Sequence, residues 1–246
     1  MKSFVRTLSY FLLALTTLAC SETKLLQKGL SPFIEPLGYD FTSPIVKGPK
    51  TDSLVILFNG LPLDSLTTVK RHKTTILPFV FFNYFDNQYQ ISLGRNSLKD
   101  DFNDFFFNSL MDESDRSGQF ALSYDSVSTD STYRLEVRID TCETTCVFQK
   151  QQIIIYYVYG YGITYTERVK PSHCKISGTA VLRKGNRLLF DKTFTSNKEL
   201  AFPGGENMYR SEMYPILSWN LAESLCQCTK DCISTLVRET NKAIAQ

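Results

Sequence analysis

The sequence has few of the residues on which enzymes rely for acid–base and nucleophilic chemistry. Its 246 residues include only two histidines, His72 and His173. His173 directly precedes Cys174, and neighbouring residues on a strand point apart, so the two are not placed as a nucleophile and its base. The sequence also lacks a Gly-x-Ser-x-Gly motif, a glycine-rich phosphate loop and a metalloprotease helix motif. We therefore expect binding rather than catalysis, and no cofactor.

Neither sign of charge is in excess once the N-terminal segment is set aside. The chain has 27 Lys and Arg against 25 Asp and Glu, and residues 1–20 contain Lys2 and Arg6 but no acid. The rest of the chain is formally neutral. Nucleic-acid binding depends on neutralising phosphates with excess basic residues, so we expect no nucleic-acid partner.

The N-terminal uncharged stretch is too short for a permanent transmembrane helix, which needs about 20 apolar residues. Thr7–Ala19 follows the two cations and ends in a small residue, which is typical of a secretory signal. The ending Thr17-Leu18-Ala19-Cys20 resembles a bacterial lipobox, in which the cysteine is acylated and becomes the mature N-terminus. This resemblance predicts a lipoprotein signal peptide at residues 1–20, acylation of Cys20 and attachment to membrane lipid. The alternative is an ordinary signal peptide with an incidental cysteine.

Cysteine usage agrees with export. An even number of cysteines outside the cytoplasm indicates disulfides, and we expect at least two. The alternative is a metal site, because thiolates and the His173 imidazole are ligands that zinc accepts. The spacings do not match a zinc ribbon, so we expect no metal. The candidate disulfide residues are Cys142, Cys146, Cys174, Cys226, Cys228 and Cys232.

Composition divides the remaining chain into two parts. Residues 21–50 contain prolines and glycines at short intervals, which predicts an irregular tether between the membrane and the folded part. Residues 51–246 are long enough for one large domain.

Apolar periodicity predicts the fold class of this domain. Ser97–Ser117 and Tyr214–Ala243 have the spacing of amphipathic helices. Tyr133–Ile139 alternates between apolar and charged residues, which predicts a half-buried strand. Cys142–Cys146 is interpreted as the following turn, and Lys184–Asn186 as the turn of a hairpin. The sequence therefore predicts an α+β fold, with an antiparallel meander sheet and both helices packed on one face.

One predicted strand, Gln152–Thr166, is apolar on both faces and has no obvious cover for the second. Burying that face needs the strands of residues 53–93, the tether or a partner protein, and we weigh a partner protein against the N-terminal strands. We take Tyr157, Tyr159 and Tyr161 as the candidate interaction surface. A closed cavity lined by these tyrosines would instead favour a hydrophobic small-molecule ligand.

The order of elements resembles a loose group of bacterial envelope lipoproteins. The likeness is carried by the lipobox, by the Phe102–Leu110 helix leading through Gly118–Leu122 into a strand, and by Gly178–Leu182 followed by the hairpin turn. The group includes auxiliary lipoproteins of ABC-type transport systems, the lipoprotein that plugs the lipopolysaccharide-insertion barrel, and activators of penicillin-binding proteins. The likeness covers about residues 53–244.

Membership of this group would imply a non-enzymatic accessory subunit that docks onto an envelope protein. By the sorting rule of the same group, Ser21 implies the outer membrane. The alternative function is an envelope carrier or sensor that binds a hydrophobic small molecule or a metal.

Overall fold

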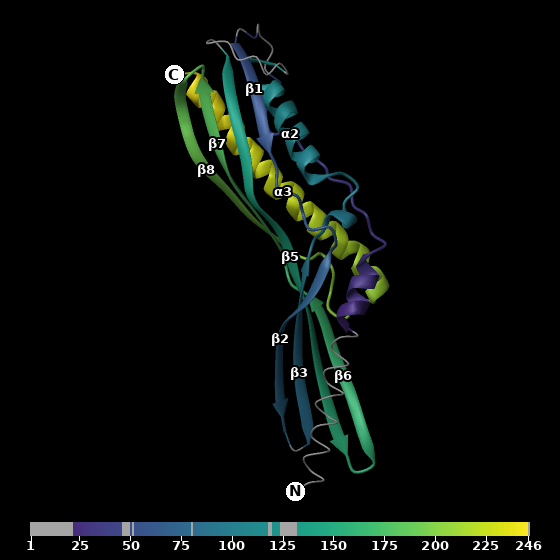
Figure 1. Cartoon of the computed structure of the whole chain (residues 1–246). Helices are drawn as coiled ribbons and strands as arrows, with labels where there is room; N and C mark the ends of the chain where they lie inside the picture. The colour runs from purple at the N-terminus through teal and green to yellow at the C-terminus, as the bar shows by residue number, and fades with distance from the viewer. Residues whose placement is uncertain are drawn as a thin grey trace.

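One long strand, β5 (Tyr133–Tyr157), runs through most of the length of the molecule (Figure 1). The computed structural model describes residues 22–45, 50, 52–79, 81–117, 120–123 and 132–245. The described residues form one sheet of eight strands with helices on one side. The other elements are β1 (Asp52–Asn59), β2 (Thr68–Pro78), β3 (Phe82–Ser92), the 3-10 helix η1 (Arg95–Ser97), α2 (Phe102–Ser117), β4 (Phe120–Leu122), β6 (Gly160–Val169), β7 (Ser172–Lys184), β8 (Arg187–Leu200) and α3 (Arg210–Ile244).

The first half of β5 belongs to what we call the body, with β1, β4, β7, β8, α2 and α3. There β5 pairs antiparallel with β7 and parallel with β1, and β1 pairs parallel with β4. The predicted α+β class is confirmed, but the purely antiparallel meander is wrong, because the sheet is mixed. The chain leaves β1 through the β2–β3 hairpin and returns through α2, and a crossover of that length permits parallel pairing.

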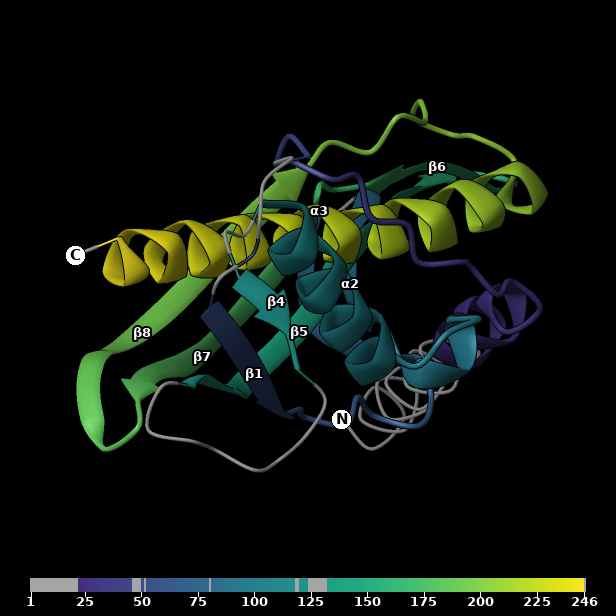
Figure 2. The same ribbon diagram turned by 90° about the horizontal axis from the view of Figure 1, so that it is seen from above.

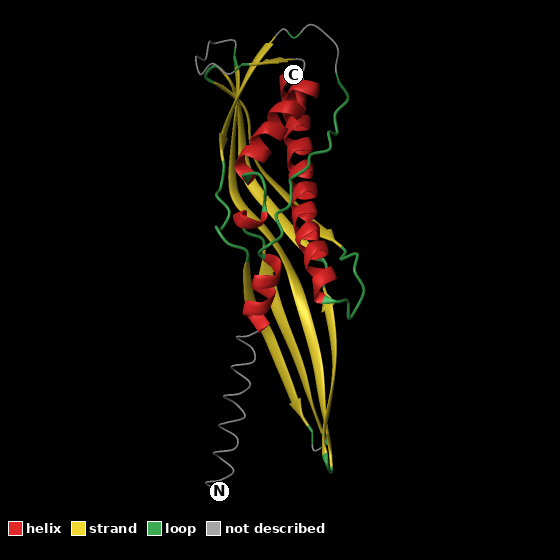
Figure 3. Ribbon diagram, turned by 90° about the vertical axis from the view of Figure 1, so that its right-hand side faces the viewer, coloured by secondary structure: helices red, strands yellow, loops and turns green. Residues whose placement is uncertain are grey.

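The second half of β5 belongs to what we call the finger, a four-stranded ribbon in the order β2-β3-β5-β6. There β5 pairs antiparallel with β3 on one side and β6 on the other. Figure 3 shows the finger extending beyond the helices that lie against the body.

The core lies between the body sheet and two helices on the same face, as predicted (Figure 2). On β5, Tyr133, Leu135, Val137 and Ile139 are buried, whereas Arg134 and Arg138 are exposed on the other face. α3 packs against β7 and β8, and α2 packs against α3. The apolar stripes predicted for both helices supply many of the buried side chains, including Phe102, Phe106, Leu110, Leu217, Leu221, Leu225 and Leu236.

Two local predictions are wrong, and both concern β5. Cys142–Cys146 is not a turn, because β5 continues through it. Its threonines favour strand, and the stretch contains no glycine, proline or asparagine that would favour a turn. Gln152–Thr166 is not one strand, because the chain turns at Val158 and Tyr159 and returns as β6. In contrast, the hairpin turn at Lys184–Asn186 is confirmed, with Gly185 at a φ of 51°.

The segment predicted as an irregular tether is instead partly helical and attached to the body. Residues 22–30 form a helix whose Leu26 and Leu30 enter the core. Further along, Glu35 forms a parallel bridge with Leu98. The Glu113 carboxylate of α2 accepts hydrogen bonds from the backbone N–H groups of Thr42 and Ser43. These contacts bring the start of the described chain to the junction between body and finger (Figure 1).

Candidate binding surface

The far end of the finger is covered with exposed apolar side chains, and we call this set the finger tip. Tyr159 is fully exposed, Val158 is 89% exposed and Phe81 is 74% exposed. The predicted surface residues Tyr157 and Tyr161 are 63% and 68% exposed. The complete set is Ile76, Leu77, Phe79, Phe81, Phe82, Ile153, Tyr156, Tyr157, Val158, Tyr159, Tyr161, Ile163 and Tyr165.

The finger tip exposes a large apolar area in total, spread over both faces of the ribbon and its turns. Six of its aromatic side chains are at least half exposed. An aromatic side chain carries about 150–250 Å² of surface, so these six alone expose on the order of 600–1,000 Å². The largest patch on a typical monomer is about 300–600 Å². The finger tip therefore has the size of an interaction surface.

The strands of residues 53–93 do not bury this surface. β3 pairs edge to edge with β5, which extends the ribbon and leaves both faces open near the tip. Tyr156 and Tyr157 point to opposite faces, since they are neighbours on a strand, and both are exposed. Of the covers considered from the sequence, the N-terminal strands are therefore excluded, and the described residues of the predicted tether lie against the body instead.

A buried charge cluster joins the base of the finger to the body. Arg210, the first residue of α3, donates from Nη2 to Glu22 and from Nε to Glu167 Oε2 at 3.0 Å. Lys150 Nζ of β5 lies 3.4 Å from Glu167 Oε1 and 3.5 Å from Glu22 Oε2. The side chains of Glu167 and Glu22 are only 8% and 11% exposed. The cluster thus fixes residue 22, two strands of the finger and α3 to one another.

The balance of burial and pairing sets the ionisation of Glu167. Burial alone would raise the pKa of this carboxyl, but the hydrogen bond and charge of Arg210 and the charge of Lys150 outweigh it. The pKa of Glu167 is therefore held below its ordinary value. The carboxylate form stabilises the junction at neutral pH.

The predicted disulfide residues lie mostly at the contact between α3 and the sheet, and all six are free thiols in the structure. Cys228 Sγ of α3 donates to the carbonyl oxygens of Cys174 at 3.5 Å and Ser196 at 3.4 Å. A hydrogen bond between the two thiols lowers the pKa of Cys228 to about 7 and raises that of Cys174. Burial and the nearby Cys228 thiol raise the pKa of Cys142 and Cys232.

The other two cysteines lie apart from that group. Cys146 is fully buried in β5, and burial is the cause that raises the pKa of its thiol. Cys226 Sγ accepts a hydrogen bond from the Gly38 N–H at 3.4 Å. Disulfide formation stays a prediction, and the structure indicates which pair is best placed for it.

We expect Cys174 and Cys228 to form a disulfide in an oxidising compartment. The bond would close a loop of 54 residues between β7 and α3 and raise the free energy of unfolding by about 2–4 kcal/mol. Mass spectrometry of unreduced, thiol-blocked protein should find the two cysteines in one linked peptide pair. Cys228→Ser should remove this pair, whereas Cys146→Ser should keep it. Six blocked thiols in the wild-type protein would contradict the expectation.

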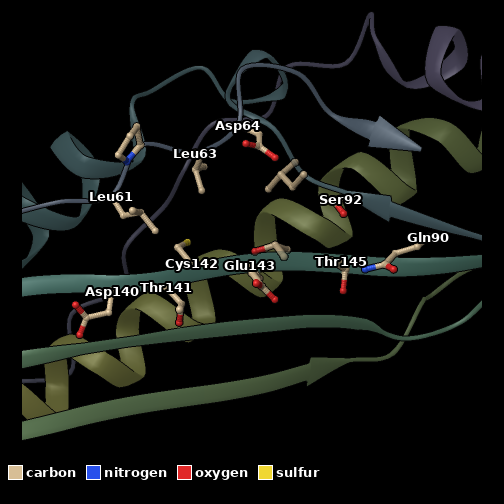
Figure 4. Close-up of a pocket in the computed structure, with 13 residues that line it drawn as sticks. Leu61, Leu63, Asp64, Gln90, Ser92, Asp140, Thr141, Cys142, Glu143 and Thr145 are labelled. Carbon is tan, nitrogen blue, oxygen red and sulfur yellow. The ribbon is translucent and has the colours of Figure 1, made fainter. Parts of the chain in front are cut away.

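One described pocket lies elsewhere, between the 61–64 loop, the end of β3 and the middle of β5 (Figure 4). It has a volume of about 440 Å³. In Figure 4 Cys142 points from β5 toward Leu61 and Leu63. The Asp140 carboxylate at its edge accepts a hydrogen bond from Arg138 Nε at 2.8 Å. The three candidate tyrosines line neither this pocket nor the described pockets of about 300 and 220 Å³, so they form an open surface rather than a cavity.

His173 and Cys174 point apart, as expected for neighbours on a strand. His173 is exposed on β7, with Nε2 3.5 Å from Glu199 Oε2, whereas Cys174 is fully buried. Within the described ranges, no three His, Cys, Asp or Glu side chains are grouped closely enough to hold a metal ion. A search of the described helices finds none that is both long and apolar enough to span a membrane. Cys20 lies outside the described residues.

The sequence reasoning found the three tyrosines but missed the other half of the surface. Phe79, Phe81 and Phe82 come from the β2–β3 turn and lie beside the β5–β6 turn at the same end of the finger. The sequence does contain a pattern that indicates this second half of the surface. Residues 74–85 and 151–166 contain no charged residue, and these two uncharged stretches are the ones that form the end of the finger.

Comparison with known proteins does not assign a family. No protein-family model matches the chain, and no curated protein is similar to it. Among solved structures, the chain is similar to the crystal structure of protein XCC0632 from Xanthomonas campestris, of family DUF330. The sequence identity is 13% and the TM-score 0.45, over 87% of this chain and 97% of that chain. The function has to be inferred from the residues of this chain and their arrangement.

Proposed function

We propose that this chain is a non-enzymatic, lipid-anchored protein of the cell envelope that acts by docking. Its role is that of an accessory subunit of an envelope transport or assembly system, with an envelope protein as partner. The anchor is acylated Cys20 and the membrane is the outer membrane, facing the periplasm or the surface. The observation that carries the proposal is the finger tip, an exposed aromatic surface at the free end of the finger, beyond the junction at which the described chain begins.

The finger tip supports docking because its apolar side chains contribute nothing to the core. The body has a continuous core between its sheet and helices, and the finger tip lies outside it. An exposed apolar surface of this size is unfavourable in water and is found where another surface covers it. A carrier or sensor would place these aromatic side chains around a cavity, and the three candidate tyrosines line none of the described pockets.

Cys20→Ser should release the mature protein from the membrane or leave it unprocessed. One acyl chain binds a bilayer only marginally and two or more hold firmly, so a diacylated cysteine accounts for stable attachment. We expect the wild-type protein in the detergent phase after phase partitioning, with an acyl mass increment on Cys20. The matched control Cys226→Ser should behave as wild type.

The docking step is tested in the same cells. A photo-crosslinker at position 159 should give an adduct with an envelope component in the wild-type background and lose it with Cys20→Ser. A crosslinker at Asn186, in the hairpin at the other end of the sheet, is the control position. An unmodified mature protein in the aqueous phase, with no adduct from position 159, would overturn the proposal.

A further inference from the structure

The uncharged part of the finger ends at the same level on all four strands. Across the ribbon Thr75 pairs with Asp86, Asp86 with Gln151, and Gln151 with Thr166. Beyond this row, toward the tip, the described residues of the four strands carry no charged side chain. From Gln151 to Tyr157 the strand extends about 20 Å, at about 3.3 Å per residue. This is slightly more than one leaflet of hydrocarbon, about 15 Å.

The two turns at the finger tip consist of apolar and aromatic residues, a composition typical of a surface that is buried away from water. The β5–β6 turn is made by Val158 and Tyr159 and follows Tyr157, the last residue of β5, and the β2–β3 turn is flanked by Phe79 and Phe81. The β7–β8 hairpin, at the opposite end of the same sheet, provides an internal comparison, because its turn is Lys184-Gly185-Asn186. Turns that face water favour glycine and polar residues, as that hairpin does.

The finger tip is apolar on all sides. This favours a bilayer over a protein as the surface that covers it. Exposed apolar side chains lie on both faces of the ribbon and at both turns. A docked protein covers one patch, whereas a bilayer surrounds whatever enters it. Five of the exposed side chains are tyrosines, which are enriched at membrane–water interfaces: Tyr156, Tyr157, Tyr159, Tyr161 and Tyr165.

Charges next to the uncharged part fit the headgroup region. Lys70, Arg71 and Lys73 of β2 are exposed next to it along the strand, and Lys24 and Lys28 are exposed on the N-terminal helix that starts at the base of the finger. The two carboxylates buried nearby, of Glu22 and Glu167, are already paired with Arg210 and Lys150. Exposed basic side chains at this level attract anionic phospholipid headgroups.

The predicted anchor belongs to the same end of the molecule. Cys20 is two residues before Glu22, and two residues span at most about 7 Å. Glu22 is fixed at the base of the finger by Arg210 and Lys150. The described C-terminal residues lie at the far end of the body (Figure 1). A membrane that holds Cys20 therefore faces the finger.

We propose that the finger tip inserts into the bilayer to which Cys20 is attached, with an anionic phospholipid surface as the matching partner. This inference rests on the proposed anchor and names what the docking surface contacts. Insertion is confined to one leaflet and its headgroups. β2 and β6 each pair with one strand in the described sheet, and their free edges carry backbone groups that the hydrocarbon centre would leave without hydrogen bonds. The envelope component that the finger tip contacts is then the phospholipid, and the body is held at a fixed orientation above the membrane.

Tryptophan quenching by brominated phospholipids tests the insertion in the full-length, acylated protein. Trp219 on α3 is the chain's single tryptophan and serves as the reporter for the body. A second variant combines Trp219→Phe with Tyr159→Trp, which replaces a fully exposed aromatic residue by another. Both are reconstituted into vesicles of phosphatidylethanolamine and phosphatidylglycerol. We expect the tryptophan at position 159 to lose most of its emission and shift to shorter wavelength, while Trp219 keeps its emission.

The possible results distinguish a failure of membrane insertion from a failure of acylation at Cys20. Suppose that the acyl increment is verified by mass and the protein remains on the vesicles. Unquenched emission at position 159 would then overturn insertion, but it would not contradict the proposal of a lipid-anchored docking protein. A protein adduct from a photo-crosslinker at position 159 in intact envelopes, together with unquenched emission, assigns the surface to a protein partner instead. Quenching at position 159 in protein that lacks the acyl increment supports insertion and overturns the anchor.

Discussion

Arg210→Ala is expected to lower the free energy of unfolding by about 3–5 kcal/mol, the cost of removing one partner from a buried ion pair. Arg210 donates to both Glu22 and Glu167, and its guanidinium carbon lies 5.6 Å from the centre of the Phe148 ring. Without it, Lys150 alone faces two nearly buried carboxylates. Denaturant unfolding at neutral pH measures the loss.

Acidification should affect the wild type more strongly than Arg210→Ala, through the protonation of Glu167. In the wild type the pKa of Glu167 is lowered on folding, so its stabilisation is full above the unfolded pKa, near 4.5, and lost as pH falls through the folded value. In Arg210→Ala only Lys150 remains to offset burial, so we expect the folded pKa of Glu167 to be higher than in the wild type. Mild acid then costs the variant less stability than the wild type, because protonation removes a buried charge that is incompletely paired. The difference between the two proteins should therefore narrow as pH falls from 7 toward 4.

Arg168→Ala is the matched control for this experiment. Arg168 is also a basic residue at the base of the finger, but it and Glu206 are 44% and 61% exposed and their closest atoms are 3.8 Å apart. Exposed pairs of this kind contribute about 0–1 kcal/mol. Arg168 Nε also donates a hydrogen bond to Gln149 Oε1 at 2.9 Å, so we expect a small loss for Arg168→Ala, below that for Arg210→Ala. An Arg210→Ala loss no greater than that of Arg168→Ala would contradict the structural role of the cluster.

Strong periodicity made the body predictable. The alternation over Tyr133–Ile139 gave the correct face of β5, and the repeat of leucine and cysteine gave the buried face of α3. Both elements carry one apolar face and one polar face. An element with one apolar face can be buried in only one orientation, with that face against a second layer.

The finger was predicted poorly because its sequence has no such contrast. Gln152–Thr166 is apolar on both faces, so the pattern does not reveal where the strand turns. The turn itself consists of Val158 and Tyr159, which turn preferences do not identify. The parallel pairing of β1 was also hidden, because a short apolar run has the same composition in a parallel and in an antiparallel sheet. Leu26 and Leu30 are four residues apart and indicated the N-terminal helix, but the prolines and glycines that follow favoured an irregular tether.

The stretch Gln152–Thr166 is apolar on both faces. This pattern hid the β5–β6 turn, but it also identified the candidate surface. Tyr157, Tyr159 and Tyr161 were singled out because nothing in the predicted fold covered them, and in the structure they are exposed. What the sequence alone did not provide is the pairing of two uncharged stretches, 74–85 and 151–166, into one tip. That arrangement depends on long-range strand register, which follows from the whole sheet rather than from either stretch.

The central claim is that the finger tip serves contact and not stability, and Tyr159→Asp tests it most directly. The variant is studied in the full-length protein with a photo-crosslinker at Phe81, on the neighbouring turn, and Asn186→Asp is the control at the opposite hairpin. We predict that the free energy of unfolding stays within about 0.5 kcal/mol of wild type, as for other exposed positions. We also predict that the envelope adduct from position 81 is largely lost, because a carboxylate beside it opposes burial of the tip. An undiminished adduct, or a loss of several kcal/mol in stability, would contradict the claim.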